Sequence, residues 1–238
     1  MTEYAKPYPH DPIVEIAPDL FMVRGSMKMN AFVNISRNMA IVRHEGDLTL
    51  INPIRLNAKG EAELQALGTV KRLIRLGSFH GIDDQYYADI FGAEMWRQPG
   101  GEAYPSPAPT VTLTEDTELP FPDAELFLFR GLNQPEGALL INKAGGVLIT
   151  CDGIQHYGDY RFVTWYARPM LARMGFPKTT IIGPFWITAM VPEGLDIQIE
   201  FNRLLEMKFD KLLAAHGSLL ESGAHAAVEK ALKKLAAA

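Results

Sequence analysis

The chain has 238 residues, 47% of them apolar, and its 23 Lys and Arg against 28 Asp and Glu leave a net charge of 23 − 28 = −5. This length and apolar content exclude collagen-like and disordered classes and are typical of one large or two small globular domains. The charges form no basic block or stripe, so we expect neither a nucleic acid nor a membrane surface as partner.

The only cysteine is Cys151, which excludes a disulfide within the chain and a zinc site made of several cysteines. Residues 1–12 read as an N-terminal arm and lack the apolar core of a signal peptide, and no segment approaches the ~20 apolar residues that cross a bilayer. These features predict a cytoplasmic protein. Its oligomeric state stays open, with a homo-oligomer among the alternatives.

The first half of the chain begins with short β-rich runs at residues 13–16, 20–24, 31–35, 39–43 and 48–51, which predict an antiparallel opening. A helix over residues 58–67 and a buried strand over residues 70–76 follow and predict a crossover unit. A short helix is expected over residues 85–91. Residues 97–109 are rich in Pro and Gly and predict a loop with little regular structure.

The second half repeats this order of strands and then helices. Strands are predicted at residues 124–129, 137–142 and 147–150, the last two joined as a hairpin. Helical patterns cover residues 162–174, 197–207 and 219–235, and a short apolar run lies at residues 211–214. Two sheets packed face to face, each with its own helices, form the simplest layered α/β solution.

Polar side chains follow several of the apolar strands at the point where each strand ends. His80, Asp83 and Asp84 follow the strand at 70–76, Asp152 and His156 follow the strand at 147–150, and His216 follows the run at 211–214. Strand ends of layered α/β proteins converge on one rim, where ligands bind. His nitrogens and carboxylate oxygens from several loops are ligands for a zinc-like ion, which lowers the pKa of bound water to about 7. The pattern favours hydrolysis of a small-molecule substrate.

The order of these motifs resembles the metallo-β-lactamase superfamily. The matching stretches are Leu48–Asn52, His80–Asp84, Leu148–Gly153 and Ala214–Gly217, within a resemblance that runs from Leu20 to Gly217. The resemblance implies the superfamily's four-layer αββα sandwich of two mixed sheets, as a single domain over residues 1–238. It also implies that Asp152 is the bridging aspartate and His216 the last histidine of the family.

The chain departs from the family's first metal motif, His-x-His-x-Asp-His, in which only His80 and Asp84 are retained. Ile82 and Gln85 stand at the other two ligand positions, and Leu132 stands where the next histidine is expected. A complete two-metal site is therefore excluded. The resemblance then implies one divalent ion, zinc in the first place, with iron, manganese or no metal as alternatives.

The expected ligands of this ion are His80, Asp84, Asp152 and His216, with Asp83 as an equal alternative to Asp84. We expect Asp152 to orient the attacking water as the base, and His156 to act as a spare ligand or as an acid. The substrate would be an ester, lactone, amide or phosphoester. The alternative is a metal-free scaffold that binds a small molecule or a partner protein, because fold does not fix function.

Simpler interpretations stand beside these. Asp83 or Asp84 could cap the helix that begins near Gln85, and His80 could bond to loop carbonyls. The thiol of Cys151 is expected in the core, since neighbouring residues of a strand point to opposite faces.

Overall fold

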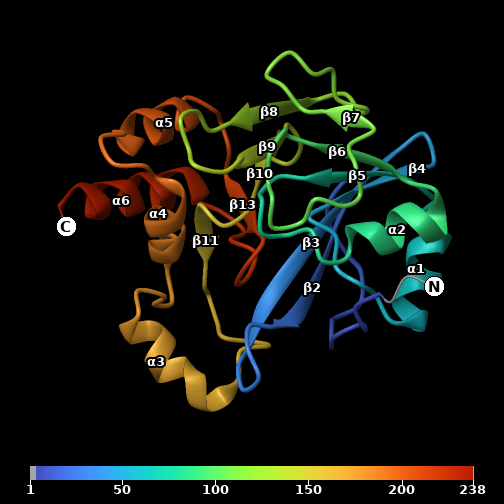
Figure 1. Cartoon of the computed structure of the whole chain (residues 1–238), viewed down its shortest axis with the longest axis horizontal. Coiled ribbons are helices and arrows are strands. Elements are labelled where there is room, and N and C mark those ends of the chain that lie inside the picture. The colour runs from blue at the N-terminus through green and yellow to red at the C-terminus, as the bar shows by residue number, and fades with distance from the viewer. Residues whose placement is uncertain (1–3, 238) are drawn as a thin grey trace.

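The computed structural model describes residues 4–237, so residues 1–3 of the predicted N-terminal arm lie outside it (Figure 1). The first half of the chain forms a seven-stranded sheet in the order β1-β2-β3-β4-β5-β6-β7. The strands from β1 to β4 pair antiparallel, and β4 to β7 pair parallel. The bounds of these strands are β1 Val14–Ala17, β2 Leu20–Lys28, β3 Asn34–His44, β4 Asp47–Ile51, β5 Thr69–Arg75, β6 Glu94–Arg97 and β7 Val111–Thr112.

The second half forms a four-stranded sheet in the order β13-β10-β9-β8, and β11 pairs with β12 beside it. The strand β10 pairs antiparallel with β9, as the hairpin predicts, and parallel with β13. The strands are β8 Ala124–Leu128, β9 Gly137–Ile141, β10 Val147–Thr150, β11 Ile154–His156, β12 Thr180–Ile182 and β13 Lys211–Ala214.

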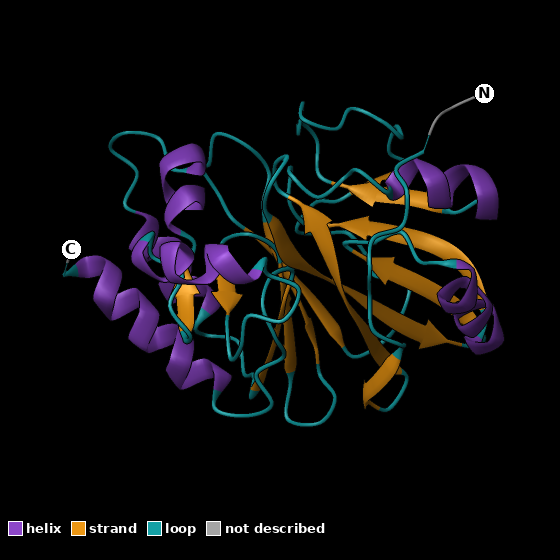
Figure 2. Cartoon of the chain, turned by 90° about the horizontal axis from the view of Figure 1, so that it is seen from below, coloured by secondary structure: helices purple, strands orange, loops and turns teal. Residues whose placement is uncertain are grey.

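Helices cover the outer face of each sheet. The helices α1 and α2 pack their apolar side chains on the seven-stranded sheet, whereas α4, α5 and α6 pack on the four-stranded sheet. Figure 2 shows the two sheets side by side with helices beyond them. The helical elements are α1 Ala58–Leu67, α2 Asp84–Phe91, η1 Trp165–Ala167 (one 3₁₀ turn), α3 Arg168–Arg173, α4 Pro184–Met190, α5 Ile197–Leu204 and α6 Ala224–Ala236.

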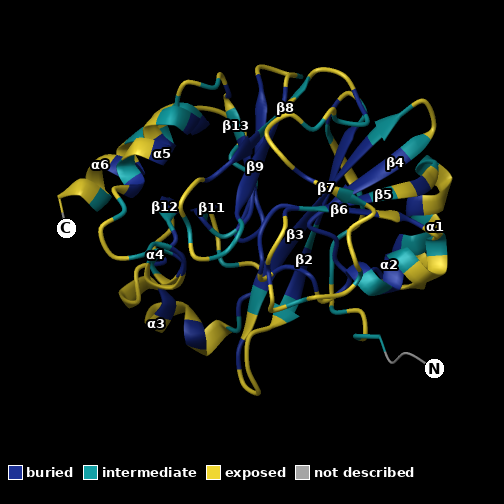
Figure 3. Ribbon diagram, turned by 45° about the horizontal axis from the view of Figure 1, so that its top comes forward, coloured by how far each residue is buried: buried dark blue, intermediate teal, exposed yellow. Residues whose placement is uncertain are grey.

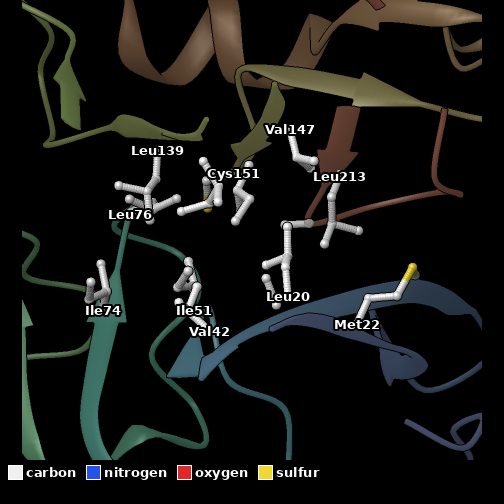
Figure 4. Close-up of a cluster of buried hydrophobic side chains, with 14 of the residues drawn as sticks. Leu20, Met22, Val42, Ile51, Ile74, Leu76, Leu139, Val147, Cys151 and Leu213 are labelled. Atoms are coloured by element: carbon white, nitrogen blue, oxygen red, sulfur yellow. The ribbon is translucent and has the colours of Figure 1, made fainter. Parts of the chain in front are cut away.

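The core between the sheets is built from the inward residues of both. Leu20, Ile51 and Ile74 of the first sheet meet Leu139 and Leu213 of the second (Figure 4). Burial of such side chains contributes about 1.5–3 kcal/mol each, which holds the two sheets together. The predicted four-layer αββα sandwich of two mixed sheets is confirmed. Within the described residues, the helices include none with the length and apolar character of a membrane span.

One difference from the sequence prediction bears on the site. The two runs predicted at residues 31–35 and 39–43 form the single strand β3, which continues through Ser36, Arg37 and Asn38. These three polar residues break the apolar pattern, yet each is almost fully buried. Each of them forms hydrogen bonds with loops of the second half or of the β5–α2 connection, as described below.

The predicted helix over residues 162–174 is also shorter in the structure. The 3₁₀ turn η1 comes first, and α3 follows with Pro169 in its first turn. Proline is favoured there because the first helical N–H groups have no intrahelical partner. Most of α3 is exposed in Figure 3.

The predicted loop at 97–109 is irregular from residue 98 onward, because Arg97 is the last residue of β6.

Candidate metal centre

Three side chains from distant parts of the chain meet where β5, β10 and β13 end. His80 lies in the loop after β5, Asp152 in the turn after β10, and His216 directly after β13. The Nε2 atom of His80 lies 3.1 Å from Oδ2 of Asp152, and the Nε2 atom of His216 lies 3.0 Å from its Oδ1. Both imidazoles thus direct the same ring nitrogen at one carboxylate. The predicted meeting of residues 80, 152 and 216 is present in the structure.

The polar segment of β3 fixes the orientation of His216. Its Nδ1 lies 2.7 Å from the backbone carbonyl oxygen of Ser36, and the hydroxyl of Ser36 accepts a hydrogen bond of 2.7 Å from the N–H of Gly217. The amide of Asn38 donates to the carbonyl of Ala214 at 2.7 Å. These three hydrogen bonds from Ser36 and Asn38 therefore anchor the end of β13 to β3, although the two strands belong to different sheets.

The same hydrogen bonds determine where the His216 ring carries its proton. A carbonyl oxygen only accepts, so Nδ1 must donate to Ser36, and a neutral ring then presents a lone pair at Nε2. Burial would raise the pKa of Asp152, but imidazoles that carry a proton at Nε2, His80 first and then His216, outweigh it by attraction and hydrogen bonding and hold the pKa well below its ordinary value. A lone pair and a carboxylate 3.0 Å apart repel each other. A second proton on His216 or a cation is needed between them.

The protonation of His80 is also set by its surroundings. Burial lowers the pKa of this histidine, and the attraction of Asp152 only partly opposes the shift. A neutral His80 donates from Nε2 to Asp152, while its buried Nδ1 has no hydrogen-bond partner among the described residues. Arg37 of β3 holds this loop, because its guanidinium donates to the carbonyl of His80 at 2.8 Å.

The donor types and the two N···O distances suit a divalent metal ion, although one donor atom each of His80, Asp152 and His216 do not all lie within 4.8 Å of one another. Two imidazole nitrogens and a carboxylate are a ligand set of catalytic zinc sites, with a further position left for water. Two ligands at ~2.0–2.1 Å from one tetrahedral zinc lie about 3.3 Å apart, and the observed N···O distances are 3.0 and 3.1 Å. The bond from His216 to Ser36 is the outer contact that orients a metal-binding histidine.

The thiol of Cys151 also lies near this group. One donor atom each of His80, Cys151 and Asp152 falls within a common distance of 4.8 Å. The thiol is buried, and burial raises its pKa well above the ordinary value. Cys151 packs in the core between the sheets, as its place on the strand predicts, and its thiol is also within reach of an ion held by His80 and Asp152.

Asp84 is not brought to this group, in contrast to the sequence prediction. Its Oδ2 accepts a hydrogen bond of 2.6 Å from Nε of Arg75, and both side chains are buried. The rest of the Arg75 guanidinium donates to the carbonyls of Tyr104 and Ser106. The physical reason is charge. β5 ends in the buried Arg75, and a buried guanidinium without a carboxylate partner is strongly destabilising. Asp84 therefore pairs with Arg75 and not with the histidines.

The alternative ligand Asp83 is engaged in a similar way. Its carboxylate lies 3.5 Å from the guanidinium of Arg37, and both residues are buried. Asp83 stands directly before α2 but makes no capping hydrogen bond with its side chain. The simpler interpretation as a helix cap is therefore not what the structure shows for Asp83.

His156, predicted as a spare ligand or acid, lies on β11 with its Nδ1 2.9 Å from the hydroxyl of Thr180 on β12. This contact belongs to the small sheet and not to the group of His80, Asp152 and His216.

Sequence reasoning also missed Glu136, which is fully buried and accepts a hydrogen bond of 2.8 Å from the N–H of Gly153 through Oε1. The signal was available, since Glu136 is an acidic residue directly before the wholly apolar run of β9.

A cavity of about 340 Å³ opens in front of Asp152 and His216. Its volume lies in the range of small-molecule sites, ~300–1,000 Å³. Asp152 and His216 thus have access to a space that can hold a substrate, whereas His80 is buried and does not line the cavity.

The comparisons with known proteins agree with this architecture. No family model and no curated protein matches the sequence, but many solved structures match the fold. The DIM-1 metallo-β-lactamase is 9% identical, with a TM-score of 0.66 over 94% of this chain and 97% of its own. A metallo-β-lactamase from Hirschia baltica is 12% identical, with a TM-score of 0.60 over 95% and 97%. FIM-1 from Pseudomonas aeruginosa, in its mono-zinc form, is 11% identical, with a TM-score of 0.56 over 97% and 98%.

Proposed function

The chain has the metallo-β-lactamase fold, and we propose that it is a metal-dependent hydrolase with one divalent ion, zinc in the first place. The ligands would be His80, Asp152 and His216. The observation that carries the proposal is the approach of the Nε2 atoms of His80 and His216 to the Asp152 carboxylate, at 3.1 and 3.0 Å, with Nδ1 of His216 held by the carbonyl of Ser36. In addition, one of the similar structures was solved in a mono-zinc form.

A single ion follows from the remaining side chains. Asp83 and Asp84 are engaged by Arg37 and Arg75, and no other described His, Asp or Glu is placed to complete a second ligand set around this group. Iron and manganese accept the same ligands, so the metal is a question for the experiment. The ion would supply a nucleophilic hydroxide near neutral pH.

The chain's own residues have distinct tasks in such a reaction. The carboxylate of Asp152 is ionised, so it can orient the attacking water and accept its proton at the free lone pairs. Ser36 holds the His216 ring in one orientation through Nδ1. The apolar cavity positions the substrate and limits the access of other water molecules.

Metal content of the full chain tests this proposal. The protein is loaded with Zn²⁺, freed of excess by gel filtration and measured by elemental analysis. We expect about one ion per chain, retained in Asp84→Asn but lost in Asp152→Asn and in His216→Gln. Absence of bound metal from the loaded protein, or equal retention in all three variants, would refute the metal site.

A metal-free binding protein is the second candidate. The observation that favours it is that both imidazoles lie within hydrogen-bond distance of Asp152. If His216 carries a second proton, the two imidazoles satisfy Asp152 without any ion, and the cavity remains available. This candidate predicts ligand binding with no effect of chelators. It also predicts that Zn²⁺ raises the melting temperature of neither the wild type nor the variants.

A further inference from the structure

The cavity in front of Asp152 and His216 has walls of strongly apolar character. Helices α3 and α4 contribute Leu171, Phe185 and Trp186, and the loop after β5 contributes Phe79. Further apolar residues come from the ends of β2 and β3. A substrate group that enters this space therefore contacts mostly hydrocarbon, and the polar side chains of the lining are Asp152, Gln155, Tyr157 and His216.

Two polar side chains of the wall, Tyr157 and Gln155, are already engaged. The hydroxyl of Tyr157 donates to Oε1 of Gln155 at 2.9 Å, and Nε2 of Gln155 donates to the backbone carbonyl of Asp152 at 2.9 Å. Among the described residues that line the cavity there is no lysine or arginine. A carboxylate or phosphate group held away from the ion proposed at Asp152 and His216 would lie in this apolar space without a partner for its charge, and burial of an unpaired charge is strongly unfavourable.

The entrance of the cavity is apolar as well. Met29, Phe79 and Phe185 line the cavity although each is 40% exposed or more. Solvent-exposed apolar groups that converge on one opening mark a ligand-binding groove. An apolar ligand that covers them removes their surface from water, so the opening itself favours such a ligand.

We propose that the substrate is a neutral ester with an apolar acyl chain or aromatic acid, whose hydrocarbon part fills this cavity. This rests on the proposed function, because the ester carbonyl must lie at the end formed by Asp152 and His216. Water oxygen bonds to the carbonyl carbon, and the bond between that carbon and the alkoxy oxygen breaks. The alcohol leaves with the proton that Asp152 took from the water, so the products are one carboxylic acid and one alcohol.

Binding of the uncharged fluorescent probe N-phenyl-1-naphthylamine tests the cavity without any hydrolysis. We expect saturable binding at one site, weakened about tenfold or more by Phe185→Glu, which places a charge at the entrance. Ala189→Trp, which fills the cavity from an exposed position of α4, should weaken it similarly. The matched control is Ile199→Glu on α5, where an exposed apolar residue lies outside the lining, and it should bind as the wild type does.

Hydrolysis of p-nitrophenyl esters tests the substrate class. From acetate to butyrate, kcat/KM should rise by up to about fourfold for each methylene buried, and the anionic hemisuccinate ester should be hydrolysed more slowly than the butyrate. Preference for the hemisuccinate would overturn the inference, as would probe binding that Phe185→Glu and Ile199→Glu affect equally.

The two proposals fail in different ways. If the metal site is wrong and the cavity right, the probe binds normally to a protein that takes up no Zn²⁺. If the cavity is wrong and the metal site right, Zn²⁺ binds to His80, Asp152 and His216, and the probe does not bind at all.

Discussion

Replacement of Asp84 by Asn separates a structural carboxylate from a metal ligand. The Arg75 and Asp84 side chains are 2% and 0% exposed, and their Nε and Oδ2 atoms lie 2.6 Å apart. Asp84→Asn keeps the size of the side chain but leaves the buried guanidinium without a counter-charge. Arg75 retains only uncharged acceptors, the carbonyls of Tyr104 and Ser106 and the amide oxygen that takes the place of the carboxylate.

The expected cost follows from this burial. Removal of one partner of a buried ion pair lowers the free energy of unfolding by 3–5 kcal/mol, whereas exposed pairs contribute about 0–1 kcal/mol. Because an amide oxygen still accepts from Nε, we expect a loss near the lower limit, about 3 kcal/mol. For a chain of this length that corresponds to a fall in melting temperature of roughly 6–12 °C.

Urea denaturation followed by tryptophan fluorescence measures this loss, and Asp47→Asn is the matched control. Asp47 pairs with Arg72 at the surface, 3.3 Å apart, so its replacement should cost less than ~1 kcal/mol. Zinc content of Asp84→Asn should equal that of the wild type. Loss of metal at unchanged stability would refute the reasoning and restore Asp84 as a ligand.

Three further predictions concern the group itself. Ser36→Ala removes the hydroxyl that accepts from Gly217 and should lower the free energy of unfolding by about 1 kcal/mol and weaken Zn²⁺ binding in a competition titration. Gly217→Ala should cost more, measured by thermal unfolding, because Gly217 has φ +90° and an added Cβ would overlap the carbonyl oxygen of His156. Burial lowers the pKa of His80 below its ordinary 6.5, so the unfolded chain binds a proton at His80 more readily than the folded chain does. The free energy of unfolding of the metal-free protein should therefore fall as the pH falls through 6.5. His80→Gln should lose less over the same pH range in urea titrations.

Much of the fold could be predicted from local patterns because most elements repeat them without interruption. The helix α1 and the strands β10 and β13 occur at the expected residues, since each is bounded by turn residues and carries apolar side chains. β3 could not be read as one strand, because Ser36–Asn38 interrupt its apolar pattern. These residues serve contacts that are distant in the chain, such as that of Ser36 with His216, 180 residues away.

The same reason explains the partial prediction of the site. His80, Asp152 and His216 follow strand ends, and strand ends converge in any layered α/β protein, so their meeting could be inferred. The partner of Asp84 could not, because a carboxylate in a loop has the same local sequence whether it faces a metal or an arginine. Only the path of the chain brings Asp84 to Arg75, and this pairing is what removes it from the ligand set.

The balance of buried charge then accounts for a single site. Besides Glu136, whose pKa burial raises well above its ordinary value, three carboxyl groups lie close to the ends of β5 and β10: Asp83, Asp84 and Asp152. Two of them have a buried guanidinium, from Arg37 and Arg75, and these permanent cations need no metal. Asp152 has only imidazoles, whose charge depends on pH. Near neutral pH it is therefore the one carboxylate of the three for which a divalent ion would supply the missing positive charge.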